Sequence, residues 1–332
     1  MYDPKQIFYE PEILDYPLGQ ALREQYAGRN WIAIKNHNNI PELRQQPNRA
    51  FPELKRQLVI GVRKTHRYVP NAKVSDFLVP YTSSGCPAAC LYCYLVCHYN
   101  KCSYLRLFVN REQMLEKLIK TASGFSESRC FEIGSNSDLV LENTITGNLV
   151  WTIENFAKTE KGRITFPTKF SMVEPLLHLD HRGKVIFRMS VNPREIIETI
   201  EKGTSPLHKR IEALNRMGEA GYPCGMLIAP VILTENWEDL YAGLIETLAQ
   251  TLSPVIKRTG FIEIILMTYS FVHKAINTDA FPEAPQLYNK ELMTGRGRGK
   301  YHYKADSRQQ AERFLREKLR QCLPDMPILY IS

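Results

Sequence analysis

Short apolar runs alternate with amphipathic segments between about residues 71 and 270. The apolar runs predict six strands, at Phe77–Thr82, Cys130–Gly134, Arg163–Pro167, Lys184–Ser190, Gly225–Val231 and Phe261–Met267. The segments between them predict helices, at Arg111–Ala122, Gly147–Lys158, Pro193–Lys202, Pro206–Ala220 and Trp237–Leu252. Strands that alternate with helices form a parallel sheet, so the pattern indicates an α/β fold. Six such units are too few to close an eight-stranded barrel, and we expect an open, partial (β/α)6 TIM-like barrel.

The two ends of the chain are less regular than this central part. The first stretch mixes proline, charge and one apolar run, Leu58–Val62, whereas the last holds a Gly/Arg-rich segment and a helical pattern at Ser307–Cys322. We therefore expect an N-terminal extension (1–70) packing on the barrel (71–270) and a C-terminal hairpin and helix (271–332). Pro193 and Pro206 follow Asn192 and Ser205, which predicts two helices with a polar cap before the proline.

Charge and composition narrow the choice of compartment and partner. The chain has 43 Lys and Arg against 35 Asp and Glu, a formal net charge of +8. That balance suits a polyanionic partner such as DNA, although an ordinary basic protein would also show it. The first residues, Met1–Gly19, carry several charges, and no apolar run has the roughly 18 residues of a membrane span. We expect a cytoplasmic protein, in which thiols stay reduced.

Three cysteines follow the first predicted strand with the spacing C-x-x-x-C-x-x-C. They are Cys86, Cys90 and Cys93. Three thiolates can hold three irons of a [4Fe-4S] cluster and leave the fourth iron open for S-adenosylmethionine (SAM), which the reduced cluster cleaves to a radical. A zinc site is the alternative, with Cys97 as fourth ligand, but a closed zinc site usually has a second paired motif. The spacing, and the aromatic residue before the third cysteine, resemble the radical SAM superfamily.

Further segments, spread over nearly the whole chain, resemble the spore photoproduct lyase family. These segments are Tyr16–Gly19, Leu58–Thr65, Cys90–Leu95, Phe131–Glu132, Ser137–Asp138, Thr168–Phe170, Ser190–Asn192, Gly203–Leu207, Lys209–Ala213, Gly221–Pro223 and Ala229–Pro230. The resemblance implies a DNA-repair lyase that reverses the methyl-bridged thymine dimer of spore DNA. A deoxyadenosyl radical takes hydrogen from the lesion, a cysteine donates hydrogen to the thymine radical, and tyrosines help to regenerate SAM.

The resemblance also assigns roles to particular residues. It implies that Cys86, Cys90 and Cys93 bind the cluster and that Tyr92 and Tyr94 are the redox tyrosines. The side chains expected to line the SAM pocket are Ser137, Lys169, Ser190, Asn192 and Ala229. Lys169, Ser190 and Asn192 lie at or just past predicted strand ends, where a barrel presents its ligands. An electron donor such as ferredoxin or flavodoxin is implied as a partner.

The chain departs from the family where the hydrogen-donor cysteine is expected, because Ser135 occupies that position. A hydroxyl cannot replace the thiol, since its O–H bond is far stronger than S–H. Cys97 and Cys102 follow the cluster motif, and we favour Cys97 as the donor, although an idle thiol is an equal reading. The other thiols are less suited: Cys130 and Cys224 begin or precede strands, and Cys322 ends the last helix.

Near the C-terminus, a segment resembles the DNA-contacting hairpin of the family in its Gly-Lys-Tyr core. Its candidate DNA-binding residues are Arg296, Arg298, Lys300 and Tyr301. Arginine and lysine neutralise phosphates, and tyrosine can stack on bases that are extruded from a duplex. A flexible basic loop is the alternative. Two other functions stay open: a radical SAM enzyme of this family with another substrate, suggested by Ser135, and a non-catalytic iron–sulfur protein that binds nucleic acid.

Overall fold

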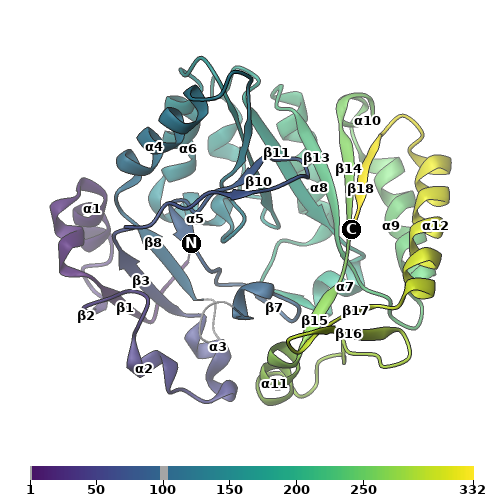
Figure 1. Ribbon diagram of the computed structural model, residues 1–332, viewed down its shortest axis with the longest axis horizontal. Coiled ribbons are helices and arrows are strands. Elements are labelled where there is room, and N and C mark those ends of the chain that lie inside the picture. The colour runs from purple at the N-terminus through teal and green to yellow at the C-terminus, as the bar shows by residue number, and fades with distance from the viewer. Residues whose placement is uncertain (1, 98–103) are drawn as a thin grey trace. The chain divides into compact units, whose positions relative to one another are not determined.

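The computed structural model describes residues 2–97 and 104–332 and divides into two compact units. Unit 1 consists of Met1–Pro87, Leu95–Thr168 and Met172–Ile186 (Figure 1). Unit 2 consists of Ala88–Tyr94, Lys169–Ser171 and Phe187–Ser332. The chain therefore changes unit inside the cysteine motif, between Pro87 and Ala88. The division of the chain near residues 70 and 270 stays a prediction.

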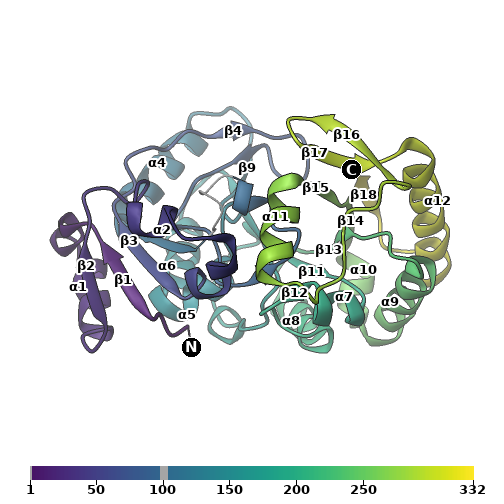
Figure 2. The ribbon, with the colours of Figure 1, turned by 90° about the horizontal axis from the view of Figure 1, so that it is seen from below.

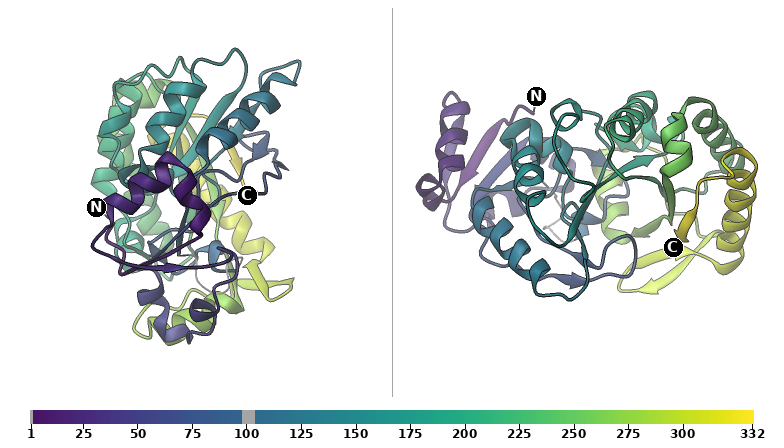
Figure 3. Two further views of the ribbon diagram at one scale, coloured as in Figure 1. Left: turned by 90° about the vertical axis from the view of Figure 1, so that its left-hand side faces the viewer. Right: turned by 90° about the horizontal axis from the view of Figure 1, so that it is seen from above.

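Unit 1 contains a five-stranded sheet that the hydrophobic pattern did not predict. Its strands run in the order β2 (Asn30–Ala33), β1 (Gln6–Tyr9), β3 (Gln57–Gly61), β8 (Leu105–Phe108) and β6 (Ser83–Ser84). All pairs are parallel except β6 with β8. The apolar run that begins at Leu58 is β3, which is fully buried. Residues of α1 (Pro17–Gln25) and α5 (Leu139–Thr146) share its hydrophobic core, and α1 is drawn in purple beside the sheet (Figure 3).

Unit 1 also holds the first of the predicted barrel strands. β9 (Cys130–Glu132) pairs in parallel with β10 (Arg163–Thr168) on one side and with β5 (Phe77–Leu78) on the other. β4 (Val69–Pro70) adds an antiparallel edge to β5. The predicted strand at Phe77–Thr82 is thus much shorter than expected. The helices of this part are α4 (Arg111–Ser123) and α6 (Asn148–Phe156), close to their predicted bounds.

Unit 2 contains a parallel run of strands in the order β11 (Val185–Val191), β13 (Cys224–Val231), β14 (Phe261–Leu266) and β18 (Ile328–Ile331). Its main helices are α8 (Leu207–Glu219), α9 (Trp237–Thr251), α10 (Pro254–Thr259) and α12 (Ala305–Cys322). Helices α9 and α12 pack together, with the rings of Trp237 and Phe314 5.1 Å apart. The pattern-based strands and helices of this unit are confirmed to within a few residues.

The expected polar caps of two helices are wrong. α7 (Arg194–Thr199) and α8 begin after their prolines, so that Pro193 and Pro206 are the N-cap residues and neither helix start has a side-chain cap hydrogen bond. Asn192 and Ser205 instead bond to residues distant in sequence. α7 also ends three residues before Lys202, because Glu201–Lys202 form a short strand, β12, that pairs with β7 (Ala89–Cys90) of the cysteine loop. Tertiary pairing thus overrides the helical periodicity there.

The expected C-terminal hairpin is present in unit 2. β16 (Met293–Gly297) and β17 (Lys300–Tyr303) form a three-stranded antiparallel sheet with β15 (Thr268–Ser270), which leads into α11 (Phe271–Ala280) (Figure 2). The turn residues Arg298 and Gly299 have φ of 52° and 69°, as a two-residue hairpin turn of this kind needs. The shorter elements of the chain are η1 (Pro11–Asp15), α2 (Pro41–Arg44), η2 (Asn48–Ala50), α3 (Phe51–Leu54), η3 (Tyr94–Cys97) and η4 (Glu174–Leu176).

Among the helices formed by the described residues, none combines the length and the apolar character that crossing a membrane requires.

Candidate active site

The backbone of the cysteine loop is held by contacts in both units. In unit 1, the Lys55 ammonium donates to the carbonyl of Cys86 at 2.8 Å. In unit 2, Cys90 pairs with Glu201 across β7 and β12, and the amide of Cys93 donates to the carbonyl of Cys90 at 3.1 Å. The three cysteines are in the reduced form, not joined in a disulfide, and are partly exposed. Three reduced, accessible thiols at this spacing are the donor set that a cubane cluster uses, so the residues fit that group.

The cysteine motif is divided between the two units. Within residues 2–97 and 104–332, no three His, Cys, Asp or Glu side chains are grouped closely enough to hold a metal ion. Cys86 belongs to unit 1, whereas Cys90 and Cys93 belong to unit 2. The convergence of the three sulfurs within one loop therefore stays a prediction.

Helix α11 fastens the loop in unit 2 through two side chains. The Nε2 of buried His273 lies 3.0 Å from the Cys93 carbonyl, and its Nδ1 lies 3.0 Å from the Ser270 hydroxyl. A carbonyl can only accept, so Nε2 carries the proton. Burial lowers the pKa of His273, which favours this neutral form. Asn277, one turn later, donates to the Leu91 carbonyl at 2.9 Å.

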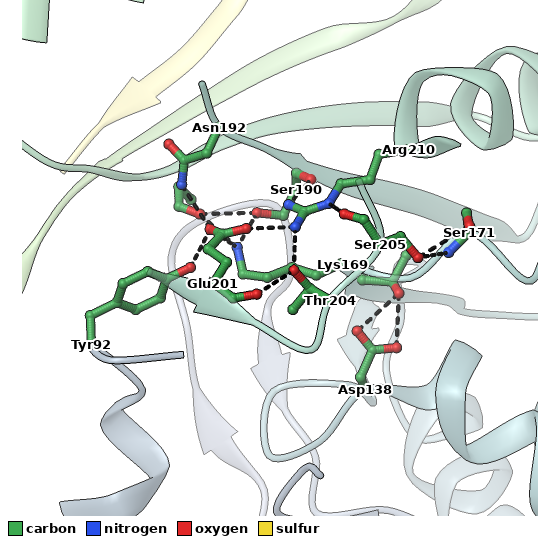
Figure 4. Close-up of polar contacts among 12 residues, drawn as sticks. Tyr92, Asp138, Lys169, Ser171, Ser190, Asn192, Glu201, Thr204, Ser205 and Arg210 are labelled. Atoms are coloured by element: carbon green, nitrogen blue, oxygen red, sulfur yellow. Dashed lines mark hydrogen bonds and ion pairs between the residues drawn. The ribbon is translucent and has the colours of Figure 1, made fainter. Parts of the chain in front are cut away.

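The centre of the candidate site in unit 2 is the carboxylate of Glu201, whose side chain is fully buried. Arg210 donates to its Oε2 at 2.6 Å, and the Lys169 ammonium lies 3.1 Å from its Oε1. The Asn192 amide donates to Oε1 at 2.8 Å, and the Tyr92 phenol donates to the same oxygen. Figure 4 shows these four side chains pointing toward the Glu201 carboxylate. They come from the cysteine loop, the residue after β10, the residue after β11, and α8.

The charges around Glu201 determine which groups are ionised. Burial alone would raise the pKa of Glu201, but the Lys169 ammonium and the Arg210 guanidinium hold that pKa at about 2. Burial, with the negative charge of Glu201, raises the pKa of Tyr92 well above its usual value. Glu201 is therefore an ionised acceptor near neutral pH, and Tyr92 keeps its phenolic proton.

The remaining contacts of Lys169 and Asn192 extend the network along the strand ends. Lys169 donates to the Ala229 carbonyl at 2.8 Å and to the Ser190 hydroxyl, which itself donates to the same carbonyl at 3.0 Å. The Asn192 Oδ1 accepts from the Tyr241 phenol at 3.0 Å. Four of the five side chains expected to line the SAM pocket are thus brought together in unit 2. Their role toward SAM stays a prediction.

The fifth, Ser137, lies in unit 1, in the segment after β9. It bridges to Gly85, next to Cys86, and its Oγ is shielded from solvent with no hydrogen-bond partner in the described part of the chain. A buried hydroxyl without a partner is costly unless a ligand completes it, so Ser137 fits a ligand contact. Its neighbour Asp138 caps α5 and accepts from the Thr168 hydroxyl at 2.8 Å (Figure 4). Ser135, in the donor position, is partly exposed.

The remaining candidates are Tyr94 and five further cysteines. Tyr94 is 52% exposed. Cys97 ends η3, its side chain lies outside the described part, and Cys102 lies entirely outside the described residues. Cys130 is the buried first residue of β9, as expected, whereas Cys224 is the first residue of β13 and does not precede it. Burial raises the pKa of Cys224 to about 12. Cys322 is the last residue of α12.

Sequence reasoning missed Glu201 and gave Arg210 no role. Arg210 lies within a segment that resembles the family, and its fully buried guanidinium also bonds the carbonyls of Ser190 and Ser205. From the sequence pattern, Arg210 in an amphipathic helix could not be distinguished from a charged residue on the surface. Glu201 lies in what the periodicity predicts as the end of a helix. The resemblance of Gly203–Leu207 to the family was the one signal in the sequence that this segment has a function.

The predicted DNA-contacting hairpin is close to the cysteine loop within unit 2. The amide of Phe271, the first residue of α11, donates to the Gly299 carbonyl in the hairpin turn at 3.0 Å. His273, two residues later, holds the Cys93 carbonyl. Arg296, Arg298 and Lys300 are exposed, whereas Tyr301 packs edge-on against the rings of Phe271 and Tyr288. The hairpin turn and the cysteine loop therefore meet the same end of one helix.

The sequence matches a known protein family and curated proteins over nearly its whole length. The family model described as "Spore photoproduct lyase" matches residues 2–332. The spore photoproduct lyase of Bacillus subtilis (strain 168) is 32% identical over 338 residues, covering 99% of this chain and 98% of that protein. That of Geobacillus sp. (strain Y412MC61) is 30% identical over 341 residues, covering 99% and 98%.

Solved structures of spore photoproduct lyases match the fold of this chain. A spore photoproduct lyase mutant with bound AdoMet (SAM) and dinucleoside spore photoproduct has a TM-score of 0.92 and 29% identity, covering 100% of this chain and 99% of that one. Another structure, a spore photoproduct lyase complexed with dinucleoside spore photoproduct, has a TM-score of 0.92 and 28% identity, and also covers 100% of this chain and 99% of that one. The α/β fold with a partial barrel of the radical SAM type is thus confirmed. The chain belongs to the spore photoproduct lyase family.

Proposed function

We propose that this protein reverses the spore photoproduct, the methyl-bridged thymine dimer of DNA, in a reaction that depends on SAM and a [4Fe-4S] cluster. The observation that carries the proposal is the Glu201 network. It ties the loop of Cys90 and Tyr92 to Lys169 and Asn192, the residues that the family resemblance assigns to the SAM pocket. The binding of AdoMet and the lesion dinucleoside by structures of the family supports the same function.

The bound cluster and SAM would supply the radical that takes a hydrogen atom from the lesion. Cys86, Cys90 and Cys93 would hold the cluster. Lys169 carries the positive charge that a carboxylate oxygen of SAM would pair with, and it would exchange one of its present acceptors, on Glu201, Ser190 or Ala229, for that oxygen. Tyr92 stands at the edge of the same network with its proton in place, as a group that returns hydrogen must.

The direct test is an anaerobic assay with reconstituted protein, SAM, a reductant and the dinucleoside lesion. The proposal predicts about four irons per chain, deoxyadenosine formation and release of thymine. Cys90→Ala should lose SAM cleavage, and Cys322→Ala, which changes a thiol at the end of α12, should not. A fully active Cys90→Ala protein would contradict the cluster assignment. A protein that binds DNA but makes no deoxyadenosine would be the non-catalytic alternative.

Ser135 is the specific reason to keep a second candidate function. If the protein cleaves SAM but releases no thymine from the lesion, the chain acts on another substrate. A physiological electron donor such as ferredoxin or flavodoxin is part of the proposal. It is tested by replacing the chemical reductant with either protein and measuring the same products.

We further propose Cys97 as the hydrogen donor that replaces the family cysteine. It follows the last cluster cysteine by four positions, so its backbone is tethered close to the site. Hydrogen transfer needs near-contact geometry, within about 4 Å of the substrate carbon. Cys97→Ala should leave SAM cleavage intact and divert repair into by-products, and a further Ser135→Cys change should restore clean thymine. Normal repair by Cys97→Ala would exclude this donor, and Cys102 would be tested next.

The hairpin around Arg298 is proposed as the DNA contact. Its support is the path through α11, which links the turn to the Cys93 carbonyl. Replacing Arg296, Arg298 and Lys300 with Gln should weaken binding of lesion DNA and lower its salt dependence by roughly one unit of slope for each phosphate that the hairpin no longer neutralises. Lys257→Gln, at the end of α10, is a control for net charge. An unchanged slope in the triple variant would remove the hairpin from the DNA interface.

A further inference from the structure

Unit 1 contains a hollow of about 400 Å³ at the carboxyl ends of its parallel strands. Glu10 directly follows β1, Lys35 lies two residues after β2, and Arg63 lies two residues after β3. The chain passes from β1 to β2 on one side and then to β3 on the other side of β1. In open parallel sheets, ligands bind outside the carboxyl ends of the strands at such a reversal of strand order.

A chain of hydrogen bonds builds one wall of this hollow. The Arg106 guanidinium on β8 donates to the Asn38 Oδ1 at 3.4 Å, and the Asn38 amide donates to the Nε2 of His37 at 3.1 Å. The Nδ1 of His37 then donates to Glu10 at 3.0 Å. Gly61 makes the last contact possible, since a Cβ there would lie 2.7 Å from the Glu10 carboxylate and 2.9 Å from the imidazole.

The charges that face the hollow are unequal. Four cations line it, Lys35, Arg63, Lys64 and Arg106, whereas Glu10 is the only carboxylate among its lining residues. Both oxygens of Glu10 are engaged, by His37 and by the amide of Val62 at 2.9 Å. Lys64 is paired with Glu12 at 2.9 Å. The hollow therefore favours an anion.

The burial and the contacts of the two guanidiniums suit them to bind a ligand. Arg106 is only 4% exposed. Arg63 lies over the buried ring of Phe108, 3.8 Å from its centroid, and its Nε donates to the Tyr81 carbonyl at 2.7 Å. Both side chains are thus fixed before any ligand arrives, which lowers the entropy lost on binding. Preorganised guanidiniums are the groups that proteins use to bind phosphate.

A second hollow in unit 1 provides an internal comparison. It has about the same volume, 410 Å³, and is lined by Asp3 and Arg29. There the one arginine forms an ion pair with the one aspartate. The two hollows are alike in size and differ in charge, so an anion should distinguish between them.

We propose that the hollow at Arg63 and Arg106 binds the phosphate of a small phosphorylated ligand of about mononucleotide size. Its volume lies in the range of small-molecule pockets, about 300–1,000 Å³, and exceeds what one phosphate fills. Side-chain amides of Asn36, Asn38 and Asn136 border it and can bond the polar body of the ligand. The enclosed position of Arg106 favours a projecting terminal phosphate over the continuous backbone of a duplex.

The test is calorimetric titration of the full-length protein, kept anaerobic and without SAM. The probes are thymidine 5′-monophosphate, inorganic phosphate and thymidine. The monophosphate should bind one to one, inorganic phosphate more weakly at the same site, and thymidine not measurably. Binding should weaken as salt is added, since the attraction is electrostatic. Because no lesion or radical chemistry is involved, the result is independent of the proposed repair activity.

Substitutions test whether the monophosphate binds in this hollow. Arg63→Gln should weaken monophosphate binding by about tenfold or more, as expected when a bond to a charged group is removed. Lys35→Gln, on an exposed side chain that the fold does not need, should weaken it by a smaller factor. Arg29→Gln, in the other hollow, should have no effect. Three results would each overturn the proposal. They are equal binding of thymidine, unchanged monophosphate binding in both Arg63→Gln and Lys35→Gln, and binding of duplex DNA without binding of the monophosphate.

Discussion

Two buried glutamates of unit 2 have the same kinds of partner and occupy different places in the fold. Glu263, in the middle of β14, binds Arg188 of β11 through bonds of 2.8 and 3.2 Å and accepts from the Tyr330 phenol of β18 at 2.5 Å. Glu201 likewise binds an arginine and a tyrosine, Arg210 and Tyr92. The partners of Glu263 are all on strands of one sheet, so its ion pair joins strands that already belong together.

Glu201 differs because its partners come from the cysteine loop, from the ends of two strands and from a helix, and not from the middle of one sheet. It lies on the two-residue strand β12, against the cysteine loop, and adds Lys169 and Asn192 just past the ends of β10 and β11. In partial and closed barrels, chemistry is found at the carboxyl ends of strands. The comparison teaches that a buried Arg–Glu–Tyr set has no function by itself. Its position relative to the strand ends and to the cysteine loop decides what it does.

The largest expected effect follows from neutralising each glutamate. Glu201→Gln and Glu263→Gln each remove the negative charge of a carboxylate that binds a buried guanidinium, and each should lower the free energy of unfolding in urea by about 3–5 kcal/mol. Only Glu201→Gln should also lose SAM binding and deoxyadenosine formation, measured per folded molecule. If folded Glu263→Gln protein loses SAM cleavage to the same extent, the distinction between the two sites is wrong.

The next effect is the response of Glu201 to acid. Its pKa is depressed from 4.5 to about 2 in the folded protein, so its contribution to stability is present above the unfolded value and is lost as the pH falls from about 4.5 toward 2. Wild-type unfolding free energy should therefore fall more steeply between pH 5 and 3 than that of Glu201→Gln, and the gap between the two proteins should narrow. Parallel curves would show that the carboxylate is not held ionised by Lys169 and Arg210.

A smaller effect is expected from the two phenols. Tyr92→Phe and Tyr330→Phe each remove one hydrogen bond to a buried carboxylate, and each should cost about 1.5–3 kcal/mol in unfolding free energy. Tyr92→Phe should also change the ratio of thymine to by-products, whereas Tyr330→Phe should repair normally. Product analysis by chromatography separates these outcomes. Unaltered products from Tyr92→Phe would leave the phenol with a packing role alone.

The smallest effect concerns the attachment of the cysteine loop. Asn277→Ala removes bonds to the Leu91 carbonyl and the Tyr269 phenol and should cost about 1 kcal/mol. It should also lower the iron retained after gel filtration, because the loop is less well held. Asn215→Ala, in α8, removes two comparable bonds, to Thr251 and Ser253 near the end of α9, and is the matched control. Equal iron retention by both variants would argue against a role of α11 in positioning the loop.

The sequence alone determined the strands and helices of unit 2, because buried parallel strands are continuous apolar runs and their helices keep a 3.6-residue period. It also determined the cysteine spacing and put Lys169, Ser190 and Asn192 at strand ends, since a strand end can be read locally. The short strands β1, β2 and β8 were not predicted. Four residues are too few to show a hydrophobic period, and the burial of these strands depends on neighbours distant in the chain.

Only the tertiary structure decided what the polar residues do. Asn192 and Ser205 read as helix caps, and Glu201 as the end of a helix, because local sequence offers each of them a local partner. In the fold, Asn192 and Arg210 turn to Glu201, and Ser205 bonds Ser171. The hollow at Arg63 and Arg106 is likewise assembled from segments that follow separate strands. A buried charge is stable only where its counter-charge is placed by the fold, and that placement is a property of the whole chain.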